Sequence, residues 1–281
     1  MPAPCVRTHR CRWHGRHGST GRPNNGNAGP CWRIRCAPGN AVVPALHGTG
    51  SFDYFAEHPE HAELFNQTMT SISQLTVAAV VAGYDFGRYP TIVDVGGGHG
   101  PLLAAILQAA PASRGVLYDL PGVVDAAPDL LCGPDIEDRV RIVTGSFFDG
   151  VPGGGDAYVL KNIVHDWSDE QAVQILRNVR AAAGPRATLL LIELVIPDHD
   201  RDFPGKWADL EMLLNLAGRE RTAEQYRDLL SQAGFHMTRV VRTASPLSVV
   251  EANAAAAGSP EARRHTGRHP LRVARSGIAR R

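Results

Sequence analysis

The chain has 281 residues, 43% of them hydrophobic and 20% charged, which is enough to build a sizeable core in one or two domains. Its net charge of +1 combines unlike parts: residues 1–46 hold seven Arg and no acidic residue, residues 251–281 hold seven Arg against two Glu, and the segment between carries −11. The acidic middle disfavours a polyanionic substrate, and the basic ends lack the interleaved aromatics of a nucleic-acid-binding module.

Membrane insertion and secretion are not indicated. The most apolar stretch, "TLLLIELVIP", is interrupted by Glu193 and is far shorter than the roughly 18 residues that a membrane span needs. The N-terminus has no apolar core typical of a secretory signal. We therefore expect a cytoplasmic protein without nucleic-acid or membrane partners.

Residues 1–50 form a basic, glycine-rich opening with too few aliphatic residues to order its backbone, so we expect a disordered or aberrant segment. Its composition also resembles a gene read out of frame. Four cysteines, Cys5, Cys11, Cys31 and Cys36, are of the residue type that binds zinc, but their spacings match no tight zinc knuckle. No metal is predicted.

Residues 51–90 have a helical texture. The stretch "FDYFAEHPEHAELFNQTMTSISQLTVAAVVAGYDF" places apolar residues at three-to-four spacing, which predicts an amphipathic helical region.

From Thr91 onward short apolar strands alternate with helical patterns. Strands are predicted at 91–95, 115–119, 140–144, 157–161 and 188–194, and helices near 101–110, 121–127, 169–183, 206–217 and 222–233. "FHMTRVVRT" and "LSVVEA" then predict an antiparallel hairpin. Strands joined by crossover helices form a parallel, doubly wound sheet, so residues 91–252 are predicted to be an α/β domain with seven strands, followed by a loose basic tail over 253–281.

The glycine-rich stretch "TIVDVGGGHGP" follows the first strand and opens a helix. No Lys-Ser or Lys-Thr follows, which excludes a phosphate loop, and the third glycine of a dinucleotide fingerprint would fall at Pro101. The loop suits a ligand without a pyrophosphate. Asp119 ends the second strand beside this loop, where a carboxylate accepts hydrogen bonds from both hydroxyls of a ribose. The pattern indicates an adenosine ligand.

Six motifs together carry a family resemblance: "DVGGGHG", "YDLP", "GSFFDGVP", "LKNIVHDWSDEQAVQIL", "LLLIELVIPD" and "DLEMLLNLAGRERTAEQYRDLLSQAGF". In order and spacing, residues 50–250 resemble S-adenosylmethionine-dependent O-methyltransferases of the caffeate and small-molecule type, including bacterial enzymes that tailor polyketides and carotenoids. The resemblance implies a Rossmann-like class I methyltransferase fold, S-adenosyl-L-methionine as cofactor, and a phenolic or enolic hydroxyl of a small molecule as acceptor.

The same resemblance implies cofactor contacts from Gly96, Gly98, Asp119, Ser146, Phe147 and Lys161. The two glycines line the methionine and ribose part, and Ser146 and Phe147 bracket the adenine. The family usually has Asp where Ser146 stands, and a hydroxyl lacks the charge-assisted part of that hydrogen bond, so adenine binding is expected to be weaker.

By resemblance His165 is the general base, and Glu193 and Glu220 orient it or stabilise its charged form. Transfer of a proton from a phenol of pKa about 10 to an imidazole of pKa about 6.5 is unfavourable by roughly 4.8 kcal/mol. Proton removal is therefore expected to be concerted with methyl transfer.

Met212, Leu213 and Leu216 fall where the family lines its acceptor pocket, but core packing explains each equally well. Asp166 and Trp167 beside the base have structural explanations as good as functional ones, and Ser168 is predicted to cap the following helix.

The resemblance also implies homodimers formed through a helical N-terminal domain. We expect the basic, glycine-rich residues before "FDYF" not to form that domain, and residues 51–90 to be a helical linker or a remnant of the dimerisation region. The apolar faces of residues 52–83 are therefore expected to be exposed. Two further functions stay open beside the O-methyltransferase: a catalytically weak paralogue that binds cofactor or a partner, and a relative that uses the same site for hydroxylation or decarboxylation.

Overall fold

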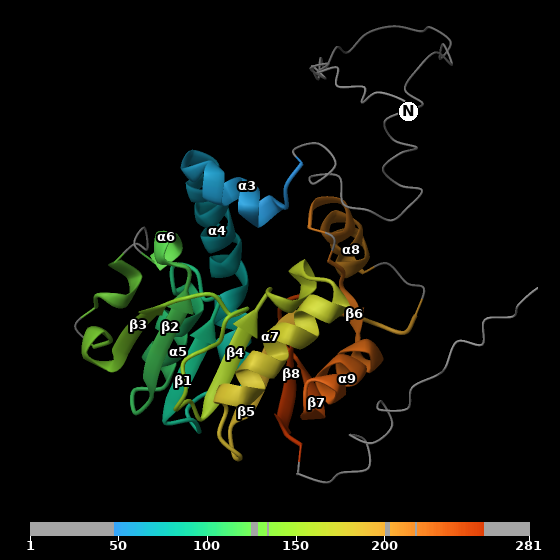
Figure 1. Cartoon of the computed structure of the whole chain (residues 1–281). Coiled ribbons are helices and arrows are strands. Elements are labelled where there is room, and N and C mark those ends of the chain that lie inside the picture. Colours follow the sequence, from blue (N-terminus) through green and yellow to red (C-terminus); the bar gives the residue numbers. More distant parts are fainter. Residues whose placement is uncertain (1–47, 125–128, 134, 200–202, 217, 256–281) are drawn as a thin grey trace, which may run out of the picture.

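The structure is a computed structural model that describes residues 48–124, 129–133, 135–199, 203–216 and 218–255 (Figure 1). The predictions for the four N-terminal cysteines, for nearly all of segment 1–50 and for the tail from residue 256 lie outside the described residues. The helical region and the α/β domain lie within them.

A twisted, mixed sheet forms the centre of the described part. Its strands are β1 (Thr91–Val95), β2 (Arg114–Asp119), β3 (Val140–Thr144), β4 (Ala157–Lys161), β5 (Thr188–Ile196), β6 (Arg221–Thr222), β7 (Phe235–Arg242) and β8 (Leu247–Ala254). Their order is β3-β2-β1-β4-β5-β8-β7, and the two-residue β6 pairs with β5. β1 to β5 run parallel and β8 is antiparallel to both neighbours. The predicted doubly wound sheet with a closing antiparallel hairpin is confirmed.

The helices are α3 (Ser51–Glu57), α4 (Pro59–Gly83), α5 (Pro101–Ala109), α6 (Pro121–Val124), α7 (Asp169–Ala182), α8 (Pro204–Asn215) and α9 (Ala223–Gln232), with 3-10 turns η1 (Asp129–Leu131), η2 (Glu137–Arg139) and η3 (Val164–Asp166). Ser168 accepts a hydrogen bond from the Gln171 N–H and caps α7, as predicted. Thr222 and Gln225 form a capping box at α9. The predicted helical stretch after residue 51 is two helices, because Pro59 begins a new one.

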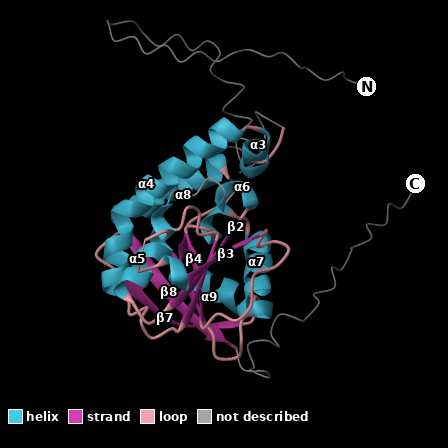
Figure 2. Cartoon of the chain, turned by 90° about the vertical axis from the view of Figure 1, so that its left-hand side faces the viewer, coloured by secondary structure: helices cyan, strands magenta, loops and turns pink. Residues whose placement is uncertain are grey.

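Helices cover both faces of the sheet, and each face has its own core (Figure 2). Successive side chains of a strand point to opposite faces, so Val93 and Val95 pack with α7 and α9, while Ile92 packs with α4 and α5. A strand that is buried on both faces needs a nearly continuous run of apolar residues. Such runs predicted β1, β4 and β5 from the sequence.

The sheet has its topological switch point between β1 and β4. β2 and β3 lie on one side of this pair and β5, β8 and β7 on the other, so the chain leaves β1 and β4 in opposite directions and opens a crevice at their carboxyl ends. α3 and the start of α4 lie above this edge (Figure 1).

Apolar side chains are exposed on two helices above the sheet: Leu64, Ile72 and Leu75 on α4, and Trp207, Leu210 and Leu213 on α8. The exposed α4 residues agree with the expectation for residues 52–83. Among the helices of the described ranges, none has the length and apolar character needed to cross a membrane.

Candidate active site

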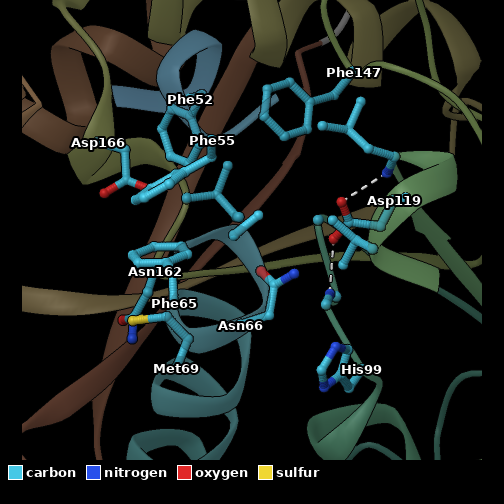
Figure 3. Close-up of a pocket in the computed structure, with 18 of the residues that line it drawn as sticks. Phe52, Phe55, Phe65, Asn66, Met69, His99, Asp119, Phe147, Asn162 and Asp166 are labelled. Atoms are coloured by element: carbon cyan, nitrogen blue, oxygen red, sulfur yellow. Dashed lines mark hydrogen bonds between the residues drawn. The ribbon is translucent and has the colours of Figure 1, made fainter. Parts of the chain in front are cut away.

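A cavity of about 710 Å³ lies at the carboxyl edge of the sheet. Its floor is the loop that follows β1, its sides are the segments after β2, β3 and β4, and its roof is α3 and α4. Figure 3 shows its two ends: Asp119 and Phe147 at one, and Asp166, Asn162 and Met69 at the other.

The loop of residues 96–100, called the glycine loop below, needs its glycines. Gly96 and Gly98 have φ angles of +70° and +60°, a region that other residues rarely adopt. A Cβ on Gly96 would stand 2.5 Å from Ile163 Cδ1, whereas a Cβ on Gly98 would meet no atom within 4 Å. Gly96 therefore permits close packing against the segment after β4, and Gly98 leaves space open over the loop.

Asp119 faces the cavity and is fixed by the backbone. Its Oδ2 accepts a hydrogen bond from the Gly98 N–H at 2.8 Å, and its Oδ1 accepts one from the Leu120 N–H at 2.7 Å. Burial raises the pKa of Asp119, and these two N–H groups counteract part of that effect. The carboxylate is thus held in place beside the loop with lone pairs left for a ligand.

Ser146, Phe147 and Lys161 line the same cavity. Ser146 Oγ accepts a hydrogen bond from the Phe148 N–H, and Asn178 Nδ2 donates to the Phe147 carbonyl, so the segment after β3 is ordered. Lys161 donates to Ser73 Oγ of α4 at 2.9 Å, and burial lowers its pKa. All six residues expected to bind the cofactor therefore border one cavity.

His165 lies in η3 and is surrounded by carboxylates. Its Nδ1 is 2.7 Å from Glu220 Oε1 and 3.8 Å from Glu193 Oε2, and its Nε2 is 3.2 Å from Asp166 Oδ1. These four residues are called the His165 cluster below. Burial opposes a charge on the imidazole, but Glu193, Glu220 and Asp166 outweigh it and raise the pKa of His165 to about 10.

Glu193 holds the backbone under the histidine. It is fully buried, and its Oε1 accepts hydrogen bonds from the N–H groups of Ile163 and Val164 at 3.2 and 2.9 Å. Asn162, at φ +53° the one non-glycine residue with positive φ in the described part, turns the chain so that both N–H groups reach it. Burial raises the pKa of Glu193 to about 7. Glu220, not Glu193, makes the direct hydrogen bond to His165.

Arg221 fixes η3 from the other side. It is fully buried and donates to the carbonyls of Val164 and Trp167 at 2.9 and 3.0 Å and to Asp169 Oδ1 at 2.8 Å. A Cβ on the nearby Gly218 would stand 2.0 Å from the His165 carbonyl oxygen, so glycine is needed there. β6 therefore positions the turn that carries His165.

Asp166 is the member of the His165 cluster that lines the cavity; His165, Glu193 and Glu220 lie behind it. Burial raises the pKa of Asp166 to about 6, although the charge of His165 opposes the shift. Figure 3 places Asp166 beside Phe52 and Phe55 of α3. Phe52 also stacks on Trp167 with ring centroids 5.1 Å apart. This end of the cavity is therefore rich in aromatic side chains, and Asp166 brings a carboxylate to it.

Met212, Leu213 and Leu216 do not border this cavity, and Leu213 on α8 is 37% exposed. Helical periodicity correctly placed them near a helix but could not tell which element covers the crevice. α3 and α4 do so instead.

His165, Glu193 and Glu220 are also close enough for one cation, since one donor atom from each lies within 4.8 Å of the others. His165 Nδ1 is already bonded to Glu220, and Glu193 Oε1 to two backbone N–H groups. A proton on His165 would offset the charge of one of these carboxylates.

Sequence reasoning missed three cavity-lining residues, Asp94, His99 and Asn162, each with a buried side-chain atom that has no hydrogen-bond partner in the structure. Asp94 and His99 stand inside the motif that drew attention for its glycines. A buried polar residue within a ligand loop is the signal that could have found them.

Comparisons with known proteins agree with this geometry. Residues 34–236 match the O-methyltransferase domain, and the chain belongs to this family. It is 44% identical over 214 residues to the phenazine O-methyltransferase PhzM of Lysobacter antibioticus, covering 76% of this chain and 63% of that protein. The chain thus spans about six tenths of the length of the curated relatives that it matches.

Solved structures give the same result. A crystal structure of LaPhzM superposes with a TM-score of 0.76 at 41% identity, over 80% of this chain and 68% of that one. The O-methyltransferase NcsB1 of neocarzinostatin biosynthesis, solved with S-adenosyl-L-homocysteine and 1,4-dihydroxy-2-naphthoic acid, superposes with a TM-score of 0.71 at 34% identity, over 80% of this chain and 66% of that one. The class I methyltransferase fold expected from the sequence is confirmed.

Proposed function

We propose that the protein is an S-adenosyl-L-methionine-dependent O-methyltransferase that acts on a hydroxyl of a small aromatic or enolic metabolite. The observation that carries the proposal is a single cavity bordered by the glycine loop and Asp119 at one end and by Asp166, backed by His165, at the other. When bound, S-adenosylmethionine supplies an activated methyl group.

The residues at the loop end fit this cofactor. The open space over Gly98 admits a ligand close to the backbone, and Asp119 offers a fixed carboxylate for a ribose diol. Phe147 offers an aromatic face for a purine, with Ser146 beside it, and Lys161 lies at the end of the neighbouring strand. Gly96 and Gly98 would line the methionine and ribose part.

The residues at the other end fit a flat acceptor. Phe52, Phe55 and Phe65 come from α3 and α4 and form contacting rings, with centroid distances of 4.8 to 6.4 Å. Aromatic rings favour stacked or edge-on contacts with another aromatic ring. NcsB1, which was solved with a dihydroxynaphthoic acid, supports an acceptor of this kind.

The proton of the acceptor hydroxyl goes to the His165–Asp166 pair. Asp166 reaches the cavity and its Oδ1 is 3.2 Å from His165 Nε2, so the pair accepts one proton as a unit. Glu220 holds the imidazole through Nδ1, and Glu193 holds the turn. The neighbouring carboxylates raise the pKa of His165 to about 10, close to that of a phenol, and this favours the charged imidazolium at neutral pH.

A second candidate, a cofactor-binding protein of low turnover, is favoured by the same charged state, because a charged His165 cannot itself take the proton and leaves only the weaker base Asp166. No feature of the site favours hydroxylation or decarboxylation.

We infer cytoplasmic activity and association with a second copy. Exposed Leu64, Leu75 and Trp207 on α4 and α8 support such an assembly, which the homodimers of the family suggest. Light scattering after size-exclusion chromatography would give the mass directly.

Calorimetric titration with S-adenosylhomocysteine followed by a methyl-transfer assay on 1,4-dihydroxy-2-naphthoic acid and a panel of phenols tests the function. His165→Ala is expected to lower kcat by roughly 10²–10⁴-fold and to leave S-adenosylhomocysteine affinity unchanged. Binding without turnover over the whole panel, or equal turnover by His165→Ala, would favour the second candidate.

A further inference from the structure

His99, in the glycine loop, has a side chain that the proposed mechanism does not use. The residue is 3% exposed and lines the cavity. Its Nδ1 is 3.2 Å from Thr70 Oγ1 on α4, and its Nε2 is buried with no hydrogen-bond partner in the described structure. A buried imidazole nitrogen that lacks a partner is costly unless a ligand supplies one.

The position of His99 is favourable for an anion. It stands between Gly98, whose N–H is bonded to Asp119, and Gly100, the residue before α5. Pro101, the first residue of α5, has no N–H, and the Leu103 N–H is bonded to Asp94, so His99 itself is the basic group at this point. Figure 3 shows His99 at the beginning of that helix, on the same side of the cavity as Asp119.

The charges of the cavity wall indicate which side chain could bind an anionic group. The described lining residues include five acidic side chains, Asp53, Glu63, Asp94, Asp119 and Asp166, and only two basic ones, Lys161 and His99. Lys161 is bonded to Ser73 and interacts with Glu193 and Asp94. Of these two basic side chains, His99 is the one whose ring nitrogen Nε2 has no hydrogen-bond partner among the described residues, so it is the candidate partner for an anionic group in this cavity.

We propose that His99 Nε2 binds the carboxylate of the methionine part of S-adenosylmethionine. The inference rests on the proposed function and adds a specific contact to it. A cofactor whose ribose is held at Asp119 would have the Gly98 backbone beside it, and the residue after Gly98 is His99. In the tautomer with the ring proton on Nε2, Nδ1 accepts a hydrogen bond from the Thr70 hydroxyl and Nε2 can donate to a carboxylate.

The experiment compares two ligands that differ only in the carboxylate: S-adenosylhomocysteine and its decarboxylated form. Calorimetry measures both dissociation constants for the wild-type protein and for His99→Ala, His99→Gln and Thr70→Val. His99→Gln keeps a side-chain N–H donor, and Thr70→Val removes only the partner of Nδ1. Thermal melting of each variant confirms that it is folded.

We expect His99→Ala to weaken S-adenosylhomocysteine binding by about ten-fold or more, since a hydrogen bond to a charged group is lost, and to leave the decarboxylated ligand unchanged. His99→Gln should recover part of the loss, and Thr70→Val should weaken the same ligand by a smaller factor. Equal weakening of both ligands by His99→Ala, or no weakening of either, overturns the role of His99 while the proposed function stands. Failure of the wild-type protein to bind either ligand overturns both.

Discussion

The two ends of the cavity are held in place by different means. At the adenosine end, the glycine loop and Asp119 are fixed by backbone hydrogen bonds and by φ angles that only glycine adopts easily. At the acceptor end, His165 and Asp166 are fixed by Glu193, Glu220 and Arg221, which come from distant parts of the chain and are all buried. The first end depends on local backbone shape and the second on paired charges.

This difference has an energetic consequence. A backbone turn made of glycines has no charge to desolvate, whereas a buried ionic cluster loses most of its stabilisation when one partner is removed. Substitutions of the buried charged residues at the acceptor end, Arg221 included, should therefore cost more stability than comparable substitutions in the glycine loop.

Arg221→Met should have the largest effect on stability. It removes the donors to the Val164 and Trp167 carbonyls, so the free energy of unfolding should fall by about 3 kcal/mol in urea denaturation. Arg219→Met is the matched control, because Arg219 pairs with the same Asp169 but is exposed, and it should cost about 0.5 kcal/mol or less. Equal losses would show that burial does not distinguish the two.

Gly96→Ala tests the loop. Its Cβ would stand 2.5 Å from Ile163 Cδ1, and the backbone has φ +70°, so strain and overlap together should cost about 2 kcal/mol. Gly98→Ala introduces the same backbone strain, at φ +60°, but no overlap with another atom. It should lower the free energy of unfolding by about 1 kcal/mol. If thermal denaturation ranks them the other way, Ile163 moves aside freely and the contact after β4 is unimportant.

Glu220→Gln should change the pH dependence. The folded pKa of His165, about 10, lies above its ordinary value of 6.5, so the charged histidine stabilises the protein fully below pH 6.5 and this contribution is lost as pH rises through 10. Removing the Glu220 charge lowers that pKa, by about one pH unit or more. Both the loss of stability and the rise of kcat/KM with pH should then move to lower pH.

The exposed Glu224, which follows β6 in the chain, provides the control for that experiment. Glu224→Gln makes the identical chemical change in the first turn of α9 and should leave both pH profiles in place. Matching shifts in the two variants would mean that net charge, not the contact with Nδ1, controls His165.

Leu75→Ala should have the smallest effect and lies outside both ends of the cavity. Leu75 is 83% exposed, so the change should cost less than about 0.5 kcal/mol in urea denaturation. Replacing Val80, which is on the same helix and fully buried, by Ala should lower the free energy of unfolding by about 2 kcal/mol. A large loss for Leu75→Ala that grows with protein concentration would instead show that a second copy covers it.

The sequence predicted the sheet well because its signals are local. β1 and β4 have the predicted bounds and β2 and β5 differ from them by one or two residues, since strands buried on both faces are short apolar runs bounded by polar turns. The sequence also predicted the N-caps of α7 and α9 at Ser168 and Thr222, because a cap depends on residues within one helical turn. Met212 and Leu216 show the limit: spacing predicts a helix, but not which neighbour its side chains meet.

The sequence by itself determined the order of strands and helices, the glycine loop after β1 and the carboxylate after β2, because each depends on residues a few positions apart. Only the tertiary structure decided that Asp166 borders the cavity in front of His165, that Glu220 bonds the imidazole while Glu193 supports its turn, and that the pKa of His165 is about 10. These properties arise when residues 165, 193 and 220 are brought together and removed from water, since burial and charge pairing belong to the folded interior and not to any segment of the chain.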